Sequence, residues 1–189
     1  MSGKTKYDRE AALVAARDVI RALRPVTNRL VVAGSLRRRK TEVGDVEILF
    51  IPTMGTITPL DSLLPVTGNM AEVLISNLIK AGILQPRLNI KGGTAMGPKN
   101  KLMQHVATGV PVDLFTATES NWFNYLVCRT GGAASNMLIA TRAQERGYKW
   151  HPYHSGYERR SDGEVIPMRS EREVFEFIGL DYLEPWERA

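Results

Sequence analysis

The feature of this sequence that most constrains its fold is the presence of single acidic residues inside apolar runs typical of β-strands. Residues 46–51 form one such run, which contains Glu47 and directly follows Asp45. Residues 110–115 form another, which contains Asp113. A lone carboxylate buried in a strand is costly, so we expect a metal ion or a basic side chain beside Asp113. The chain should therefore form a sheet that brings carboxylates to a polar site.

The spacing of Asp45 and Glu47 places both carboxylates on one face of a strand. Successive side chains of a strand point to opposite faces, so Val46 and Ile48 would point into the core. Two carboxylates on one face suit Mg²⁺, which binds carboxylate oxygens together with water and substrate phosphates. The alternative is that these acids only form structural salt bridges with the arginines at positions 37–39.

A second polar element, the Gly34-Ser35 turn, precedes these arginines. Glycine-bearing turns can present backbone N–H groups to phosphate oxygens without a side chain in the way. The guanidinium of Arg38 would add a charge-assisted contact that can be bidentate. The turn, the acidic strand and the later Asp113 together favour a site for metal and phosphate over salt bridges alone.

The hydrophobic spacing predicts an α+β fold. It predicts helices over residues 8–24, 69–82, 120–128 and 133–146, and a last helix that the capping box Ser170-x-x-Glu173 opens. It predicts strands over residues 30–33, 46–51, 87–91, 101–106 and 110–115, a loop over 52–68 and a small antiparallel sheet within 148–167. A chain of 189 residues suits one domain or two small lobes.

The composition excludes several classes of protein. The apolar stretches fall far short of the ~20 residues that cross a bilayer, and the N-terminus has no secretory pattern. Cys128 is the only cysteine, which excludes an internal disulfide, and the three histidines do not predict a thiolate zinc site. His151 and His154 have no acidic or cysteine residue nearby and are expected on a strand or turn rather than at a metal. An intracellular location fits these features.

The net charge of +5 is unevenly distributed along the chain. Residues 1–160 carry 22 Lys and Arg against 12 Asp and Glu, a net +10, whereas residues 161–189 carry 3 against 8, a net −5. A basic body suggests a polyanionic partner, because lysines and arginines that neutralise phosphates release condensed counterions. The alternative is an ordinary solvated basic surface.

Five motifs together resemble the DNA polymerase X family of the nucleotidyltransferase superfamily. In the family's order they are Gly34-Ser35-Leu36-Arg37-Arg38, Gly44-Asp45-Val46-Glu47, Val112-Asp113-Leu114, Thr130-Gly131-Gly132 with Asn136, and Glu184-Pro185. The resemblance implies a nucleotidyltransferase palm, a mixed β-sheet with helices, over residues 1–118 and a small α/β thumb over residues 119–189. Palm and thumb alone are similar to the small viral polymerases of the family, so we expect a minimal member of the kind that viruses or phages encode.

The resemblance also implies a site and a reaction. Asp45, Glu47 and Asp113 would be the catalytic residues and would hold two ions, Mg²⁺ or Mn²⁺. A primer 3′-hydroxyl would attack the α-phosphate of a dNTP; one ion would lower the pKa of the hydroxyl and the other would steady the leaving pyrophosphate. The residues expected to bind the nucleotide are Gly34, Ser35, Arg38, Gly44, Arg129, Thr130, Gly131, Gly132 and Asn136. The family often has a cis peptide at the position of Gly131-Gly132.

The sequence departs from the family pattern in three places. Glu47 stands where the family usually has Asp, which changes the reach of this carboxylate. Cys128-Arg129 replaces an aromatic pair that helps relatives to exclude ribonucleotides, so we expect weaker sugar discrimination. The short segment before the Gly34-Ser35 turn leaves no room for the family's lyase domain, so no lyase activity is expected.

The expected function is template-directed DNA synthesis of a gap-filling or repair kind, by a monomer that binds gapped or primer-template DNA and dNTP and no membrane. Phosphate contacts would come from the basic residues Lys91, Lys99, Lys101 and Arg142. The location would be cytoplasmic or nucleoid-associated. One alternative is a nucleotidyltransferase that works without a template or on RNA, a small molecule or a protein. The other is a catalytically inactive DNA-binding module.

Overall fold

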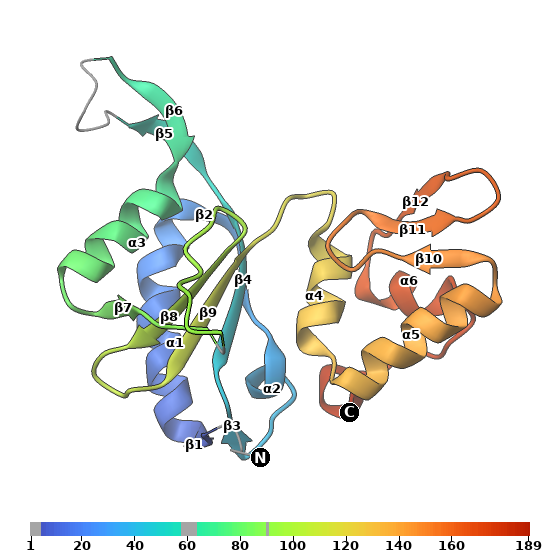
Figure 1. Cartoon of the computed structure of the whole chain (residues 1–189), viewed down its shortest axis with the longest axis horizontal. Coiled ribbons are helices and arrows are strands. Elements are labelled where there is room, and N and C mark those ends of the chain that lie inside the picture. The colour runs from blue at the N-terminus through green and yellow to red at the C-terminus, as the bar shows by residue number, and fades with distance from the viewer. Residues whose placement is uncertain (1–4, 58–63, 90) are drawn as a thin grey trace. The chain divides into compact units, whose positions relative to one another are not determined.

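The computed structural model describes residues 5–57, 64–89 and 91–189. The chain divides into two compact units (Figure 1). The first contains Met1–Val32 and Glu42–Thr116, and the second contains Ala33–Thr41 and Ala117–Ala189. The short segment at residues 33–41 therefore belongs with the C-terminal part of the chain. A single division at residue 118 would have placed this segment in the first unit.

The first unit is built on a five-stranded mixed sheet. Its order is β2-β4-β9-β8-β7, in which β4 and β9 are parallel and the other neighbours are antiparallel. The parallel pair requires a long crossover, which contains α3. The bounds of these strands are β2 Thr27–Val32, β4 Val46–Pro52, β7 Leu84–Pro86, β8 Asn100–His105 and β9 Pro111–Thr116.

Two helices cover one face of this sheet (Figure 1). Helix α1, Arg9–Leu23, and helix α3, Met70–Lys80, begin at the N-caps Asp8 and Asn69, whose side chains accept backbone N–H bonds. Their apolar sides pack on the sheet face that carries Val46, Ile48 and the buried Val112 and Leu114. The opposite face, which carries the alternate residues Glu47 and Asp113, is the face that α1 and α3 do not cover.

The remaining elements of the first unit are short. Strand β1, Tyr7–Asp8, pairs with β3, Glu42–Val43, and a 3₁₀ turn at Arg24–Val26 ends α1. Strands β5, Met54–Ile57, and β6, Val66–Asn69, form an antiparallel hairpin that extends away from the sheet (Figure 1). This hairpin lies where the sequence predicted a loop, and the described parts of residues 52–68 show that prediction to be wrong; residues 58–63 lie outside the described residues.

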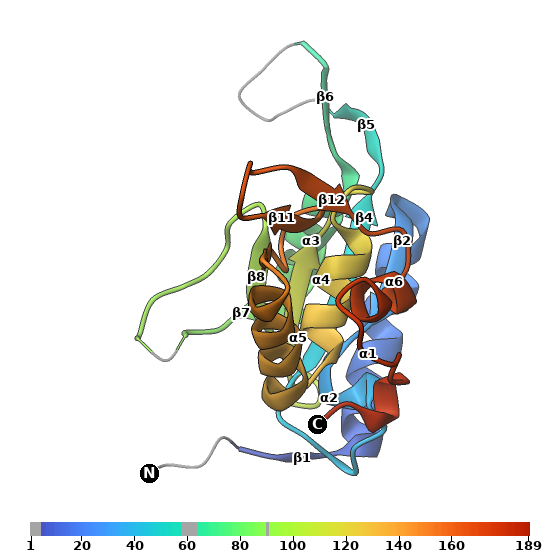
Figure 2. The same cartoon turned by 90° about the vertical axis from the view of Figure 1, so that its right-hand side faces the viewer.

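The second unit combines helices with a three-stranded antiparallel sheet, and its elements can be followed in Figure 2. Its core is a cluster of fully buried side chains that includes Val127, Ile139, Tyr157 and Val174. The bounds are α2 Gly34–Arg37, α4 Trp122–Thr130, α5 Ala133–Glu145, β10 Tyr148–Trp150, β11 Gly156–Arg159, β12 Val165–Pro167, α6 Glu171–Glu176 and a 3₁₀ turn at Pro185–Glu187.

The predicted α+β class is confirmed, as are the main helices, strands β2, β4, β8 and β9 and the small C-terminal sheet. The strand predicted over residues 87–91 lies earlier in the chain, as β7 at Leu84–Pro86, which pairs with β8. The Ser170 hydroxyl accepts the Glu173 N–H as a capping box requires. No helix in the described part of the chain is long and apolar enough to span a membrane.

Candidate active site

Two of the predicted site carboxylates lie side by side on the first unit. Glu47 on β4 and Asp113 on β9 are register partners in the parallel pair. Cross-strand partners project from the same face of a sheet, and neighbouring strands are about 4.8 Å apart. Both side chains therefore rise from the face that α1 and α3 leave uncovered. Asp45 is half-buried and immediately precedes β4, two residues before Glu47.

Asp113 has a basic neighbour, as its position in an apolar strand predicted. Arg87 Nη2 donates to Asp113 Oδ1 at 2.6 Å, and the Asp113 side chain is only 10% exposed. A buried carboxylate without such a partner would carry a large desolvation penalty. Local sequence patterns do not identify Arg87 as this partner, because the two residues are 26 positions apart and the pairing depends on the strand order.

The donor set suits a divalent cation in its chemistry. Glu47 and Asp113 offer hard oxygen donors from opposite positions of two strands, and Asp45 offers another just before β4. Among the described residues, however, no three His, Cys, Asp or Glu side chains lie close enough together to form a ready-made metal cage. The backbone thus places the carboxylate residues near one another, and their side chains would have to rotate to bind one ion together.

The Gly34-Ser35 turn belongs to the second unit, where it begins α2. Gly34 has a φ of 63°, a left-handed conformation that favours glycine. The Arg38 guanidinium is fixed by a hydrogen bond, in which its Nη1 donates to the carbonyl oxygen of Thr130 at 2.6 Å. This hydrogen bond therefore connects the turn directly to the Thr130 segment. The resemblance assigns both to the same nucleotide.

A buried charge network, which sequence reasoning missed, supports this turn. Arg37 donates to both carboxylate oxygens of Glu171, at 2.7 and 2.8 Å, and to Thr130 Oγ1 at 2.6 Å. Arg188, which is fully buried, lies 3.3 Å from Glu171 Oε1 and over the ring of Phe175. Burial raises the pKa of Glu171, but the hydrogen bonds and charges of Arg37 and Arg188 outweigh it, so the pKa lies below its ordinary value.

The Gly131-Gly132 segment links α4 to α5 and is closely packed. A Cβ built on Gly132 would lie 1.8 Å from the carbonyl carbon of Ala189, whose oxygen accepts the Ser135 N–H at 3.1 Å. Asn136 Nδ2 donates to the Cys128 carbonyl at 2.9 Å. The expected cis peptide is absent from the described residues, and this prediction is wrong: both glycines adopt extended backbone angles with trans bonds.

Arg129 contacts two tyrosines of the second unit. Its Nη2 donates to the hydroxyl of Tyr153 at 3.2 Å, and its guanidinium lies 5.6 and 5.4 Å from the ring centres of Tyr125 and Tyr153. These two rings meet edge to face at 5.0 Å. Burial raises the pKa of Tyr125, partly offset by the charge of Arg129. Two tyrosines thus orient the cation that stands beside Cys128.

The four residues expected at DNA phosphates differ in accessibility. Lys91, Lys99 and Arg142 are exposed. Lys101 is buried on the helix-covered face, where its ammonium is 2.6 Å from Glu72 Oε1 and donates to the Gly97 carbonyl at 2.9 Å. Its alternation within β8 places it on this face, so Lys101 is not available to a DNA phosphate and that expectation is corrected.

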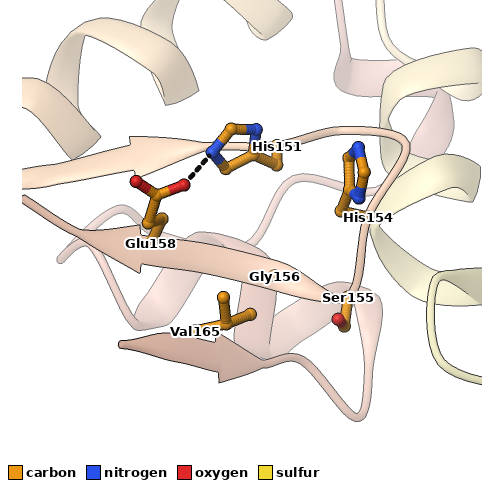
Figure 3. A pocket seen from close by; sticks show the side chains of 6 residues that line it. All are labelled: His151, His154, Ser155, Gly156, Glu158 and Val165. Atoms are coloured by element: carbon orange, nitrogen blue, oxygen red, sulfur yellow. Dashed lines mark hydrogen bonds and ion pairs between the residues drawn. The ribbon is translucent and has the colours of Figure 1, made fainter. Parts of the chain in front are cut away.

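A second polar cluster lies on the small sheet of the second unit (Figure 3). His151 Nε2 is 2.7 Å from Glu158 Oε2, and the rings of His151 and His154 are 5.6 Å apart. These residues line a cavity of about 170 Å³ with Ser155 and Val165. The sequence predicted no acidic neighbour for these histidines, and this prediction is wrong. Strands β10 and β11 pair and bring Glu158 to His151.

Comparisons with known proteins find similarity to DNA polymerases. Residues 125–189 match the family model described as the DNA polymerase beta thumb. DNA polymerase lambda of Rattus norvegicus is 27% identical over 171 residues, which cover 84% of this chain and 28% of the relative. The chain thus spans little more than a quarter of that relative's length.

Two solved structures of Leishmania infantum polymerase beta share the fold. The ternary P/T complex has a TM-score of 0.73 and 18% identity, and the match covers 98% of this chain and 77% of that one. The ternary gap complex gives the same TM-score and identity over 97% and 71% of the two chains. The C-terminal segment of this chain is therefore similar to the DNA polymerase beta thumb, and the whole chain has a polymerase beta-like fold.

Proposed function

We propose that this chain is a DNA polymerase that transfers a nucleotide from a dNTP to a primer 3′-hydroxyl. A polymerase-type nucleotidyltransferase is the class that its fold and family support. The observation that carries the proposal is the register pair of Glu47 and Asp113, with Asp45 two residues earlier on the same alternation. Packing alone does not explain this pair, because Asp113 is buried and burying a carboxylate costs free energy that an apolar residue would not cost.

The carboxylates would act by holding divalent cations and the reacting oxygen atoms. Two bound Mg²⁺ or Mn²⁺ ions would supply Lewis acidity at the attacking hydroxyl and at the leaving phosphates. Asp113, on its own strand, would face the attacking side, while Asp45 and Glu47 would face the triphosphate. The strand pair fixes the backbone spacing of Glu47 and Asp113, so only their side chains would need to turn toward an ion.

The second unit would bind the nucleotide. The N–H groups of the Gly34-Ser35 turn would meet phosphate oxygens, and Arg38 would offset charge that develops on the triphosphate. Thr130, Gly131, Gly132 and Asn136 would lie beside the sugar and base. The bonds from Arg37 and Arg38 to Thr130 support this assignment, because they join the phosphate-binding turn to the sugar-binding segment in one rigid piece.

The substrate would be a gapped or primed duplex. One of the similar solved structures is a ternary gap complex of Leishmania infantum polymerase beta, which suggests gapped DNA as the first substrate to test. Exposed Lys91, Lys99 and Arg142 would contact phosphates. The protein would act in DNA repair as a monomer, in the cytoplasm or at the nucleoid.

A single-turnover incorporation assay on a one-nucleotide gapped duplex tests this proposal. Asp45→Asn removes a metal ligand with almost no change of shape, and we expect at least about a 100-fold loss of incorporation rate, as for loss of a group that acts only in the transition state. Glu42→Gln is the matched control, because Glu42 is an exposed carboxylate on β3 close in sequence. A D45N rate near that of E42Q would refute the mechanism.

A further inference from the structure

Four residues form a row across the sheet of the first unit. Glu47 on β4 is opposite Asp113 on β9, and Asp113 is opposite Leu102 on β8. The row continues because the Arg87 N–H donates to the Leu102 carbonyl at 3.0 Å, one residue beyond the last pair of β7 and β8. The Arg87 side chain, just after β7, therefore projects from the same face of the sheet as the two carboxylates.

Arg87 reaches Asp113 over Leu102. Two strand spacings, about 9.6 Å, separate the backbones of Arg87 and Asp113, a distance that only long side chains span. The guanidinium nevertheless closes to 2.6 Å from Asp113 Oδ1. The side chain of Arg87 is 25% exposed and that of Asp113 is 10% exposed, so the pair lies largely out of water. Screening is weaker in such a site, and the pair is correspondingly stronger than a surface salt bridge.

A cation fixed beside a metal ligand has two opposite effects. It holds the carboxylate in one orientation, which favours a reaction that needs that orientation. It also neutralises charge that a divalent ion would otherwise meet, and it repels the ion.

We propose that Arg87 is a positioning residue for Asp113 that lowers the metal affinity of the site while orienting the carboxylate for nucleotidyl transfer. The inference rests on the proposed function in one respect, that the Glu47 and Asp113 pair binds a divalent ion. Arg87 gives up part of its bond to Asp113 when the ion arrives, and it holds the carboxylate in line with Glu47 before that.

The test is a Mn²⁺ titration of the whole chain without nucleotide or DNA. Electron paramagnetic resonance measures the fraction of Mn²⁺ that is bound. Arg87→Gln removes the charge and keeps a hydrogen-bonding group, and we expect its Mn²⁺ dissociation constant to fall about three- to tenfold. Arg87→Lys keeps the charge, and its dissociation constant should stay within about twofold of the original. Arg17→Gln removes an exposed arginine from α1 of the same unit and should change nothing.

A double-mutant cycle separates action through Asp113 from a general effect of charge. In the Asp113→Asn background, Arg87→Gln should tighten Mn²⁺ binding clearly less than in the unaltered chain, because only the direct repulsion of the ion is then removed and the carboxylate that Arg87 holds is gone. An equal tightening in both backgrounds would overturn the positioning role, and so would unchanged affinity in R87Q. Melting curves confirm that each variant is folded.

Failure of the two proposals gives different results. If the unaltered chain has no saturable Mn²⁺ site that Asp45→Asn weakens, the metal-dependent function itself is refuted. If that site exists and R87Q leaves it unchanged, only the role of Arg87 is refuted. Should R87Q fold poorly, R87K decides the matter alone, because tightening in a variant that keeps the charge contradicts the inference.

Discussion

Glu47 and Asp113 are direct register partners on the parallel strands β4 and β9. This pairing matters because Glu47 stands where family members usually carry aspartate. The longer side chain begins from the same backbone spacing and reaches further from the sheet. If Glu47 holds an ion, its extra methylene would change how the carboxylate reaches that ion, which leads to the first prediction.

Changing Glu47 to aspartate should preserve metal binding, whereas changing it to glutamine should not. Glu47→Asp keeps two oxygen donors, so we expect its incorporation rate within about tenfold of the original, and Glu47→Gln should lose at least about 100-fold. Single-nucleotide incorporation across a Mg²⁺ and Mn²⁺ titration measures both. Equal rates for the two variants would show that the Glu47 carboxylate is not a ligand.

Replacing Glu171 by glutamine should destabilise the second unit. The change leaves the fully buried Arg188 and the bidentate Arg37 without their anion, and loss of one partner of a buried pair costs about 3–5 kcal/mol. Urea unfolding measures this loss. Because Arg37 also bonds Thr130, the variant should in addition raise the KM for dNTP more than it lowers kcat.

The same carboxyl group predicts a pH dependence of stability. The pKa of Glu171 is lowered in the folded chain, so it binds a proton less readily there than when unfolded. Its contribution is therefore fully present above the unfolded pKa near 4.5 and is lost as the pH falls through the lower folded pKa. Acid unfolding of Glu171→Gln should lack this component, and identical pH profiles below neutrality would contradict the assignment.

The alanine substitution of Gly132 should disrupt the contact with Ala189. A Cβ at this position overlaps the Ala189 carbonyl, and overpacking of this kind costs about 1–3 kcal/mol. Gly97→Ala is the control, because a Cβ there meets nothing within 4 Å. Thermal melting of both variants tests the prediction, and equal melting temperatures would show that the segment at Ala189 yields without cost.

DNA binding should distinguish Lys91 from Lys101. Lys91→Gln removes an exposed charge, so it should weaken binding to any DNA sequence and reduce the slope of log K against log salt by about one. Lys101→Gln breaks the ion pair between the buried Lys101 and the partly exposed Glu72 and should lower stability, with the salt slope unchanged. Fluorescence anisotropy at several salt concentrations measures the slopes.

The sequence predicts which face of the sheet each strand residue occupies better than it predicts contacts between distant segments. Alternation within each strand was sufficient to place Val46 and Ile48 in the core and Glu47 on the other face, because that period is local. It also predicts that Lys101 shares a face with buried Met103, a signal that would have removed Lys101 from the DNA-binding set. Caps at Asp8, Asn69 and Ser170 were likewise readable from nearby residues.

Contacts between distant segments could not be read in this way. The bonds from Arg87 to Asp113 and from Arg37 to Glu171 depend on strand order and helix packing over 26 and 134 residues. The β5–β6 hairpin was missed because its glycines and a nearby proline suggest a loop, yet Gly55 and Gly68 are cross-strand partners. Their lack of side chains leaves room for Met70 and Ile57, which occupy the space where Cβ atoms would lie.

The most direct measurement of the proposed polymerase activity is nucleotide incorporation by the unaltered chain on a gapped duplex, opposite each of the four templating bases. We predict addition of the complementary dNTP in each case with Mg²⁺ or Mn²⁺ present, and none with a chelator. Addition without regard to the template would favour an untemplated transferase. Tight DNA binding with no incorporation under any of these conditions would contradict the proposed function and leave a DNA-binding module.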